Sequence, residues 1–281
     1  MKQSTVVYRP QMAPVHIDLP SPEEEVKVGV PWGSVDAFPS PAYWAYQVLA
    51  RRALGEMLIY KLGRNLQEEV GACLLGGHGI PAGVGLAAYE YLRSLGAFEG
   101  PAPTEESFYT WLSKPIPING RAVRYRFAKQ KAKYLAGSLR ALQSQEFPTE
   151  SGRALRDWLV SLPGIGLKTA SWIVRNWLDA DDVAILDIHI LRAGALGGFF
   201  TPGLTVEKDY LLLEQQFLEF SEALGVRPAE LDAVIWYEMM ASPKTVHGLI
   251  QRTQEGLISA TGLRPPAKKG QSNTYKLSLC S

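Results

Sequence analysis

The chain has 281 residues, which is long enough for one large domain or two smaller lobes around a hydrophobic core. Hydrophobic residues make up 46% and charged residues 20%, which excludes a largely disordered chain. Two cysteines, Cys73 and Cys280, exclude a disulfide framework and an iron–sulfur cluster, and the four histidines show no metal-ligand spacing. There is no membrane-spanning apolar run and no signal-peptide core, so we expect a cytoplasmic protein.

Charge is nearly balanced but unevenly distributed. The net charge is +1, from 29 lysines and arginines against 28 acids. Such a balance by itself is unlike that of most nucleic-acid-binding domains, which are basic. Residues 120–140, however, contain seven basic residues and no acid, whereas acids gather elsewhere, as at residues 179–182. The sequence therefore predicts one electropositive face.

Three regions differ in composition. Residues 1–40 are rich in proline and show no helical period, which predicts an extended, irregular N-terminal arm. Over residues 41–263 apolar side chains recur at three- and four-residue steps, as is typical of amphipathic helices. Residues 264–281 form a basic tail that we expect to be loosely held.

The helical region is predicted to be all-α, with short connections and no internal repeat. Strand signals are few and short. The expected helices lie near residues 43–57, 70–75, 84–95, 105–112, 125–143, 150–160, 167–178, 188–196, 207–224 and 229–240, followed by a closing segment near residues 246–261.

A glycine-containing turn at residues 162–166, Leu-Pro-Gly-Ile-Gly, joins two of these helices. Gly164 and Gly166 permit a tight turn, and their missing side chains let a phosphate approach the backbone. The N–H groups and the dipole at the start of the next helix favour an anion there. The alternative interpretation is an ordinary helix–helix turn, which helical proteins use widely.

Two ionisable residues follow this turn. Asp187 stands within an apolar run, where burying a carboxylate is costly unless the group has a structural or chemical role. Capping the next helix is one such role, and it leaves one oxygen free for chemistry. Lys168 precedes Asp187 by one helix and one connection, so the two side chains can converge on one cleft. Without Asp187, a solvated surface lysine would be the simpler interpretation of Lys168.

The run from Leu162 to Lys168, followed by Asp187 and His189, resembles the helix-hairpin-helix–Gly/Pro/Asp signature of DNA base-excision glycosylases. With lysine closing the hairpin, it is similar to the 8-oxoguanine glycosylases, and the order of helices extends the likeness over about residues 67–240. The resemblance implies two helical lobes with a cleft between them. It also implies a monomer that binds double-stranded DNA containing a damaged or modified base.

The resemblance further implies roles for individual residues. Lys168 would be the nucleophile, and Asp187 would assist departure of the base by stabilising positive charge on the sugar. The hairpin would grip a phosphate, with a structural K⁺ or Na⁺ at its backbone near Leu162 and Gly164 and no other cofactor. The predicted phosphate-binding residues are Gly164, Gly166, His189, Lys131 and Lys133.

The other candidates each have a structural alternative. Trp172 would line the base pocket or pack in the core, and mammalian-type 8-oxoguanine enzymes carry a small thiol at this place. The loop at residues 76–81 would fill the gap left by a flipped base, or be a plain glycine-rich turn. Lys131 and Lys133 fit a solvated charged face equally well, and His189 fits a structural histidine. The candidates for the wedge, the side chain inserted in place of the flipped base, are His78 and Ile80. The further base-pocket candidates are Asp232, Trp236 and Tyr237.

Three functions fit these residues. The first is a bifunctional DNA glycosylase and AP lyase that flips out and removes an oxidised purine, 8-oxoguanine foremost. The second is a non-catalytic helix-hairpin-helix protein that binds DNA. The third is a glycosylase for a different modified base, for example in defence against foreign DNA. Retention of both Lys168 and Asp187 favours an enzyme, since a binding protein needs neither.

Overall fold

A computed structural model gives the structure of the chain and describes residues 1–56, 61–77, 79–118 and 120–261. The chain divides into two compact units, Met1–Ala241 and Ser242–Ser281. The second unit includes helix α11 (Pro243–Thr261), so the helical region predicted over residues 41–263 crosses this division. The predicted basic tail, residues 264–281, lies outside the described residues.

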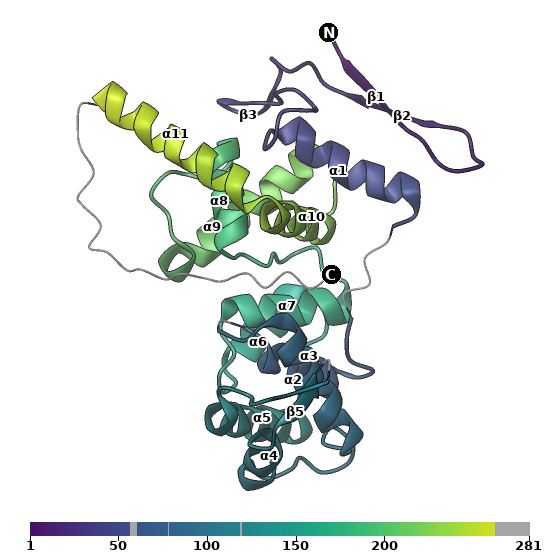
Figure 1. Cartoon of the computed structure of the whole chain (residues 1–281), viewed down its shortest axis with the longest axis vertical. Helices are drawn as coiled ribbons and strands as arrows, with labels where there is room; N and C mark the ends of the chain where they lie inside the picture. The colour runs from purple at the N-terminus through teal and green to yellow at the C-terminus, as the bar shows by residue number, and fades with distance from the viewer. Residues whose placement is uncertain (57–60, 78, 119, 262–281) are drawn as a thin grey trace. The chain divides into compact units, whose positions relative to one another are not determined.

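The first unit is built mainly of helices in two groups, as predicted (Figure 1). In one group α4 packs on α5, and α2 packs on α3, α5 and α7. This group comprises α2 (Leu66–Leu75), α3 (Ala82–Ser94), α4 (Glu105–Leu112), α5 (Ala128–Ser144), α6 (Gly152–Val160) and α7 (Leu167–Leu178). In the other group α10 contacts the remaining three helices. That group comprises α1 (Pro41–Leu54), α8 (Ile188–Gly197), α9 (Val206–Leu224) and α10 (Pro228–Ala241).

Helix starts follow from capping side chains in the sequence. Ser40, Asn65, Thr104 and Ser151 each accept a backbone N–H in the first turn of α1, α2, α4 and α6, respectively. A hydroxyl or amide oxygen at this position satisfies an N–H group that the helix itself leaves without a partner. No described helix combines the length and apolar character needed to cross a membrane.

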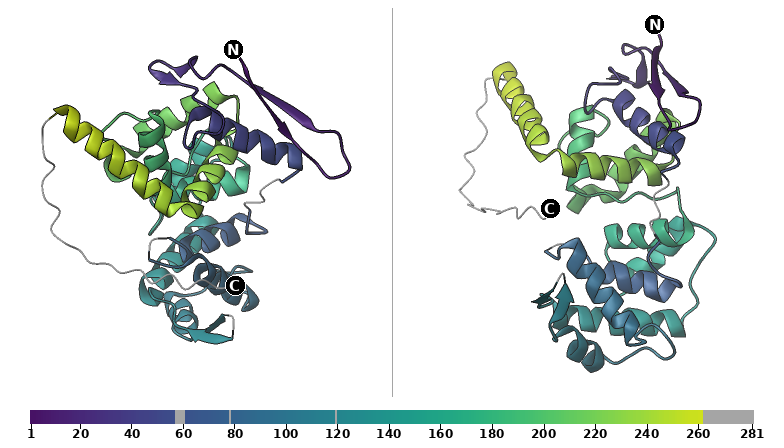
Figure 2. Two further views of the ribbon diagram at one scale, coloured as in Figure 1. Left: turned by 45° about the horizontal axis from the view of Figure 1, so that its top comes forward. Right: turned by 45° about the vertical axis from the view of Figure 1, so that its right-hand side comes forward.

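The N-terminal region differs from the prediction. The expected irregular arm contains two antiparallel hairpins, which pair β1 (Gln3–Val7) with β2 (Val15–Leu19) and β3 (Glu25–Lys27) with β4 (Val30–Pro31). The first hairpin lies beside α1 (Figure 2), with Ile17 and Leu19 of β2 buried. The prolines at positions 10, 14, 20 and 22 fall in the turns and after the strands, so the high proline content concealed these strands.

A third hairpin was also missed by the sequence analysis. It pairs β5 (Ile116–Ile118) with β6 (Arg121–Val123) directly before α5, so this helix begins at Ala128 instead of near residue 125. Tyr125 is buried, and its hydroxyl donates a hydrogen bond to the carbonyl of Leu75 at 2.6 Å. The segment therefore connects the hairpin to the C-terminal end of α2.

Candidate active site

The predicted glycine turn lies between α6 and α7 and packs into the core. Leu162 and Ile165 are buried within it. The Leu162 N–H donates to the carbonyl of Leu159 at 3.0 Å, and the Ile165 N–H donates to that of Leu162 at 3.3 Å. The Pro163 carbonyl accepts a hydrogen bond from the Ser138 hydroxyl at 3.3 Å. These contacts fix the turn against α5.

The two glycines of the turn occupy different environments. Gly164 has a φ of +77°, and a Cβ at this position would lie 2.1 Å from the ring of Tyr134. Gly166 has a φ of −96°, and a Cβ there would meet nothing within 4 Å. Backbone conformation and packing therefore require glycine at position 164 but not at position 166.

The start of α7 is suited to binding an anion. Gly166 is the N-cap residue and supplies no side-chain hydrogen bond, so the first N–H groups of α7 have no capping side chain. The open space at Gly166 gives an anion access to these groups, where the helix dipole is positive. Lys168 is the second residue of this helix and is exposed.

Asp187 uses its two carboxylate oxygens differently. Oδ1 accepts the backbone N–H groups of His189 at 2.8 Å and Ile190 at 3.1 Å, which confirms that Asp187 caps α8. Oδ2 lies 3.8 Å from Nζ of Lys168. Capping thus holds the carboxylate in place while its second oxygen faces the amine.

The lysine and the aspartate share one open site. The Lys168 side chain is 49% exposed and that of Asp187 is 12% exposed. Their separation exceeds hydrogen-bonding range, so the two groups are not locked together and a reacting carbon can contact both. The arrangement places an amine and a carboxylate side by side at the protein surface.

His189 and Trp236 extend this site. The two rings meet edge to face with centroids 6.5 Å apart. Burial lowers the pKa of His189, an effect that the nearby Asp187 carboxylate opposes. Trp236 and Tyr237 are 42% and 51% exposed, so the structure leaves both predicted pocket residues accessible.

Asp232 and Trp172 lie inside the fold. Asp232 is 3% exposed and pairs with Arg175, with 3.2 Å between Oδ1 and Nη1. Burial raises the pKa of Asp232 to about 6, although the Arg175 charge acts in the opposite direction. Trp172 is half-buried against the core, and a Cβ at Gly76 would lie 3.4 Å from its ring. Trp172 thus has the packing contacts of its structural alternative, and Asp232 is one partner of a buried ion pair.

Lys131 has a partner that the sequence did not reveal. Its ammonium donates hydrogen bonds to the carbonyls of Leu74 at 2.6 Å and Gly76 at 3.2 Å, and burial lowers its pKa. These carbonyls end α2, more than 50 residues away in sequence, so no local pattern indicates the contact. Lys131 therefore serves the fold, whereas Lys133 is exposed and available to a phosphate.

The predicted wedge loop is only partly described. Ile80 is half-buried and packs against the core, which does not favour insertion into DNA. His78 lies outside the described residues.

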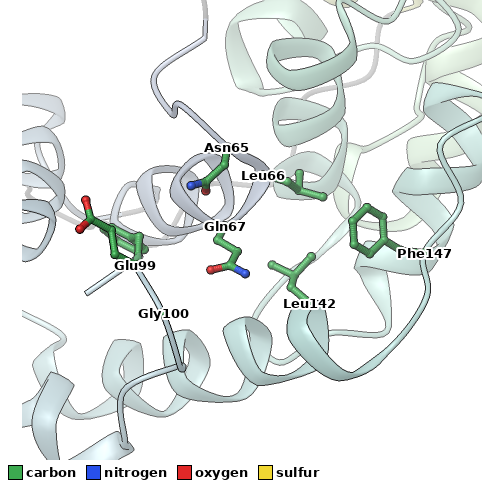
Figure 3. A pocket seen from close by; sticks show the side chains of 8 residues that line it. Asn65, Leu66, Gln67, Glu99, Gly100, Leu142 and Phe147 are labelled. Carbon is green, nitrogen blue, oxygen red and sulfur yellow. The ribbon is translucent and has the colours of Figure 1, made fainter. Parts of the chain in front are cut away.

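Two pockets of the first unit are lined by residues other than Lys168 and Asp187. One, of about 400 Å³, opens between α2 and α5 (Figure 3). Its lining includes the apolar side chains of Leu66, Leu142 and Phe147 beside Gln67, and no predicted site residue. Among the described residues, no group of three or more histidine, cysteine, aspartate or glutamate side chains is placed to hold a metal ion.

Comparison with known proteins places the chain in a family. Residues 102–226 match the family model of 8-oxoguanine DNA glycosylase. The chain is 33% identical over 137 residues to the 8-oxoguanine DNA glycosylase/AP lyase of Methanocaldococcus jannaschii, covering 47% of this chain and 66% of the relative. It is 31% identical over 163 residues to the protein of the same name from Saccharolobus islandicus, covering 54% of this chain and 73% of the relative. The chain belongs to the 8-oxoguanine DNA glycosylase family.

The likeness does not extend over the full length of every relative. The matched stretch spans 58% of the 8-oxoguanine DNA glycosylase/AP lyase of Thermoplasma volcanium, at 34% identity and over 42% of this chain. The chain thus covers between about three fifths and two thirds of the first curated relatives that it matches. The crystal structure of the M. jannaschii protein aligns with a TM-score of 0.47 and 26% identity, over 63% of this chain and 78% of that chain.

The two glycines give a test of the turn. Gly164→Ala should lower the free energy of unfolding by about 2–5 kcal/mol, because it combines a left-handed φ with a clash against Tyr134. Gly166→Ala is the matched control and should cost no more than about 1 kcal/mol, since only the N-cap preference is affected. Thermal unfolding followed by circular dichroism measures both, and equal losses would contradict this description of the turn.

Proposed function

We propose that this protein is a DNA glycosylase with AP lyase activity that removes an oxidised purine, 8-oxoguanine, from double-stranded DNA. The observation that carries the proposal is the 3.8 Å approach of the Lys168 amine to the Asp187 carboxylate beside the open turn at Gly166. Membership of the 8-oxoguanine DNA glycosylase family supports it, as do relatives named for both activities.

Base removal begins with a nucleotide flipped out of the duplex, which brings its C1′ carbon to the site. The uncharged Lys168 amine bonds to C1′ while the bond from C1′ to the base nitrogen breaks. The electron pair of that bond leaves with the base, which takes up a proton. Positive charge develops on the sugar during this step, and Oδ2 of Asp187 is placed to stabilise it.

Strand cleavage follows from the covalent bond between Lys168 and the sugar. The sugar ring opens as the C1′–O4′ bond breaks and O4′ takes up a proton, which leaves a Schiff base between C1′ and Nζ. This group acidifies the C2′ position. Loss of a C2′ proton then forms a double bond between C2′ and C3′, and the 3′ phosphate leaves with the electron pair of the C3′–O bond.

Two parts of the protein surface are suited to bind the DNA backbone. The first N–H groups of α7 would receive a phosphate at Gly166, next to Lys168. A second, basic surface follows β6 and the start of α5, and its exposed members are Arg121, Arg124, Arg126, Lys129 and Lys133. A structural K⁺ or Na⁺ near the carbonyl oxygens of Leu162 and Gly164 stays a prediction, as does a monomeric state.

Borohydride trapping tests the catalytic assignment. Wild-type protein should form a covalent adduct with duplexes that contain 8-oxoguanine or an abasic site, because borohydride reduces the Schiff base. Lys168→Gln should form none, while its affinity for DNA is retained. A uracil duplex serves as the substrate control. DNA binding without an adduct on any duplex would favour the non-catalytic alternative, and an adduct on uracil alone would favour another base.

Asp187→Asn separates the chemical role of this residue from its capping role. Asparagine caps helices as well as aspartate does, so α8 should remain intact. Base release from the 8-oxoguanine duplex should fall by about 100-fold or more, because the negative charge opposite the developing cation is lost. Single-turnover excision and DNA binding are measured side by side. Normal base release would mean that Asp187 acts only as a cap, and equal loss of both would mean that the substitution disturbs the fold.

The basic surface is tested by the salt dependence of binding. Replacing Arg121 and Arg124 together by glutamine should weaken binding and lower the slope of log K against log salt concentration by about 2, one unit per phosphate contact. The control replaces Lys2 and Lys208, exposed lysines outside this surface, by glutamine and changes net charge equally. An equal effect of both pairs would assign binding to net charge instead of to this surface.

A further inference from the structure

The segment that leads into Asp187 has no regular secondary structure, yet hydrogen bonds to side chains hold three of its residues. It runs over residues 183–187, between α7 and α8. The N–H of Ala184 donates to Glu214 at 3.0 Å, that of Ile185 to Asp232 at 3.4 Å, and that of Leu186 to the Tyr210 hydroxyl at 3.2 Å. Three consecutive backbone groups therefore each have a different side-chain acceptor.

These three acceptors are buried and come from two helices. Tyr210 and Glu214 belong to α9 and Asp232 to α10, and their exposed fractions are 5%, 3% and 3%. The Tyr210 hydroxyl also donates to the carbonyl of Ala184 at 2.8 Å. Burial raises the pKa of this phenol, which keeps the donating proton in place.

Two of these acceptors are themselves tied to the hairpin helices. Glu214 pairs with Arg156 of α6, and Asp232 pairs with Arg175 of α7. Helices α6 and α7 flank the glycine turn, and α7 carries Lys168. Two connected sets of contacts thus reach from the hairpin helices to Ala184 and Ile185, shortly before Asp187.

We propose that Tyr210, Glu214 and Asp232 are positioning residues that hold residues 184–186 so that the Asp187 carboxylate faces Lys168. This inference rests on the proposed function, because it concerns the same reaction. A displacement of about 1 Å at a reacting group can cost about 100-fold in rate. An irregular segment has no hydrogen-bonded ladder to limit such a displacement, so the side chains supply the restraint.

Tyr210→Phe is the sharpest variant, because it removes one hydroxyl without leaving a buried charge. Tyr89→Phe is its matched control. Tyr89 is also buried, at 2% exposed, and its hydroxyl lies 3.2 Å from both the Leu62 carbonyl and the Glu68 carboxylate, on a different segment. Each variant therefore loses a phenol hydroxyl that binds the backbone.

Two rates are compared on folded, full-length protein. Single-turnover excision of 8-oxoguanine requires departure of the base, whereas borohydride trapping on a preformed abasic site requires only the lysine. Tyr210→Phe should slow excision by about 10- to 100-fold and leave trapping and DNA affinity unchanged. Tyr89→Phe should leave both rates unchanged. Equal slowing of excision and trapping by Tyr210→Phe, or normal excision, would overturn the proposal.

A second variant covers the case in which Tyr210→Phe does not fold. The double substitution Arg175→Met with Asp232→Leu replaces a buried ion pair by apolar side chains, an exchange that proteins often tolerate. It removes the acceptor of the Ile185 N–H. The same selective loss of excision is expected, and proportional loss of both rates contradicts the inference.

Wild-type protein separates this inference from the proposed function. If it releases no base and traps no abasic site, the proposed function fails and this inference fails with it. If wild-type protein is active and both variants excise normally, only the positioning role is wrong.

Discussion

The buried carboxylates of Glu214 and Asp232 are the contacts on which the geometry of the site depends. Each accepts a backbone N–H from the segment before Asp187 and pairs with an arginine of the hairpin helices. A buried charge is costly unless it is paired, so neither carboxylate can move without its arginine. The two helical groups are thereby connected at the point where Lys168 and Asp187 come together.

Much of this arrangement was predictable because it depends on local pattern. Apolar residues at three- and four-residue spacing located the helices, and the position of Asp187 directly before α8 indicated its capping role. The hairpins were missed because their strands are short and contain or adjoin prolines. The turn of the first hairpin holds two prolines, whereas Pro31 and Pro117 stand inside β4 and β5 of the other two. The contact of Lys131 with the end of α2 was missed because it joins residues that are distant in sequence. The sequence pattern does not indicate which distant residue a single buried side chain will contact.

Trp172 illustrates how a candidate site residue also acts in packing. Its indole lies over Gly76, whose own Cα approaches Gly85 so closely that a Cβ on Gly85 would lie 3.2 Å from it. Gly76 at the end of α2 and Gly85 of α3 therefore leave room for the large indole ring.

The contrast between the two glycines of the hairpin has an evolutionary consequence. A descendant that kept the fold but abandoned DNA would still need glycine at position 164, because a side chain there collides with Tyr134. It would be free to lose glycine at position 166, where a side chain meets only open space. Substitutions at position 164 across related sequences would therefore report on selection for a stable protein. Substitutions at position 166 would report on selection for a ligand at its surface.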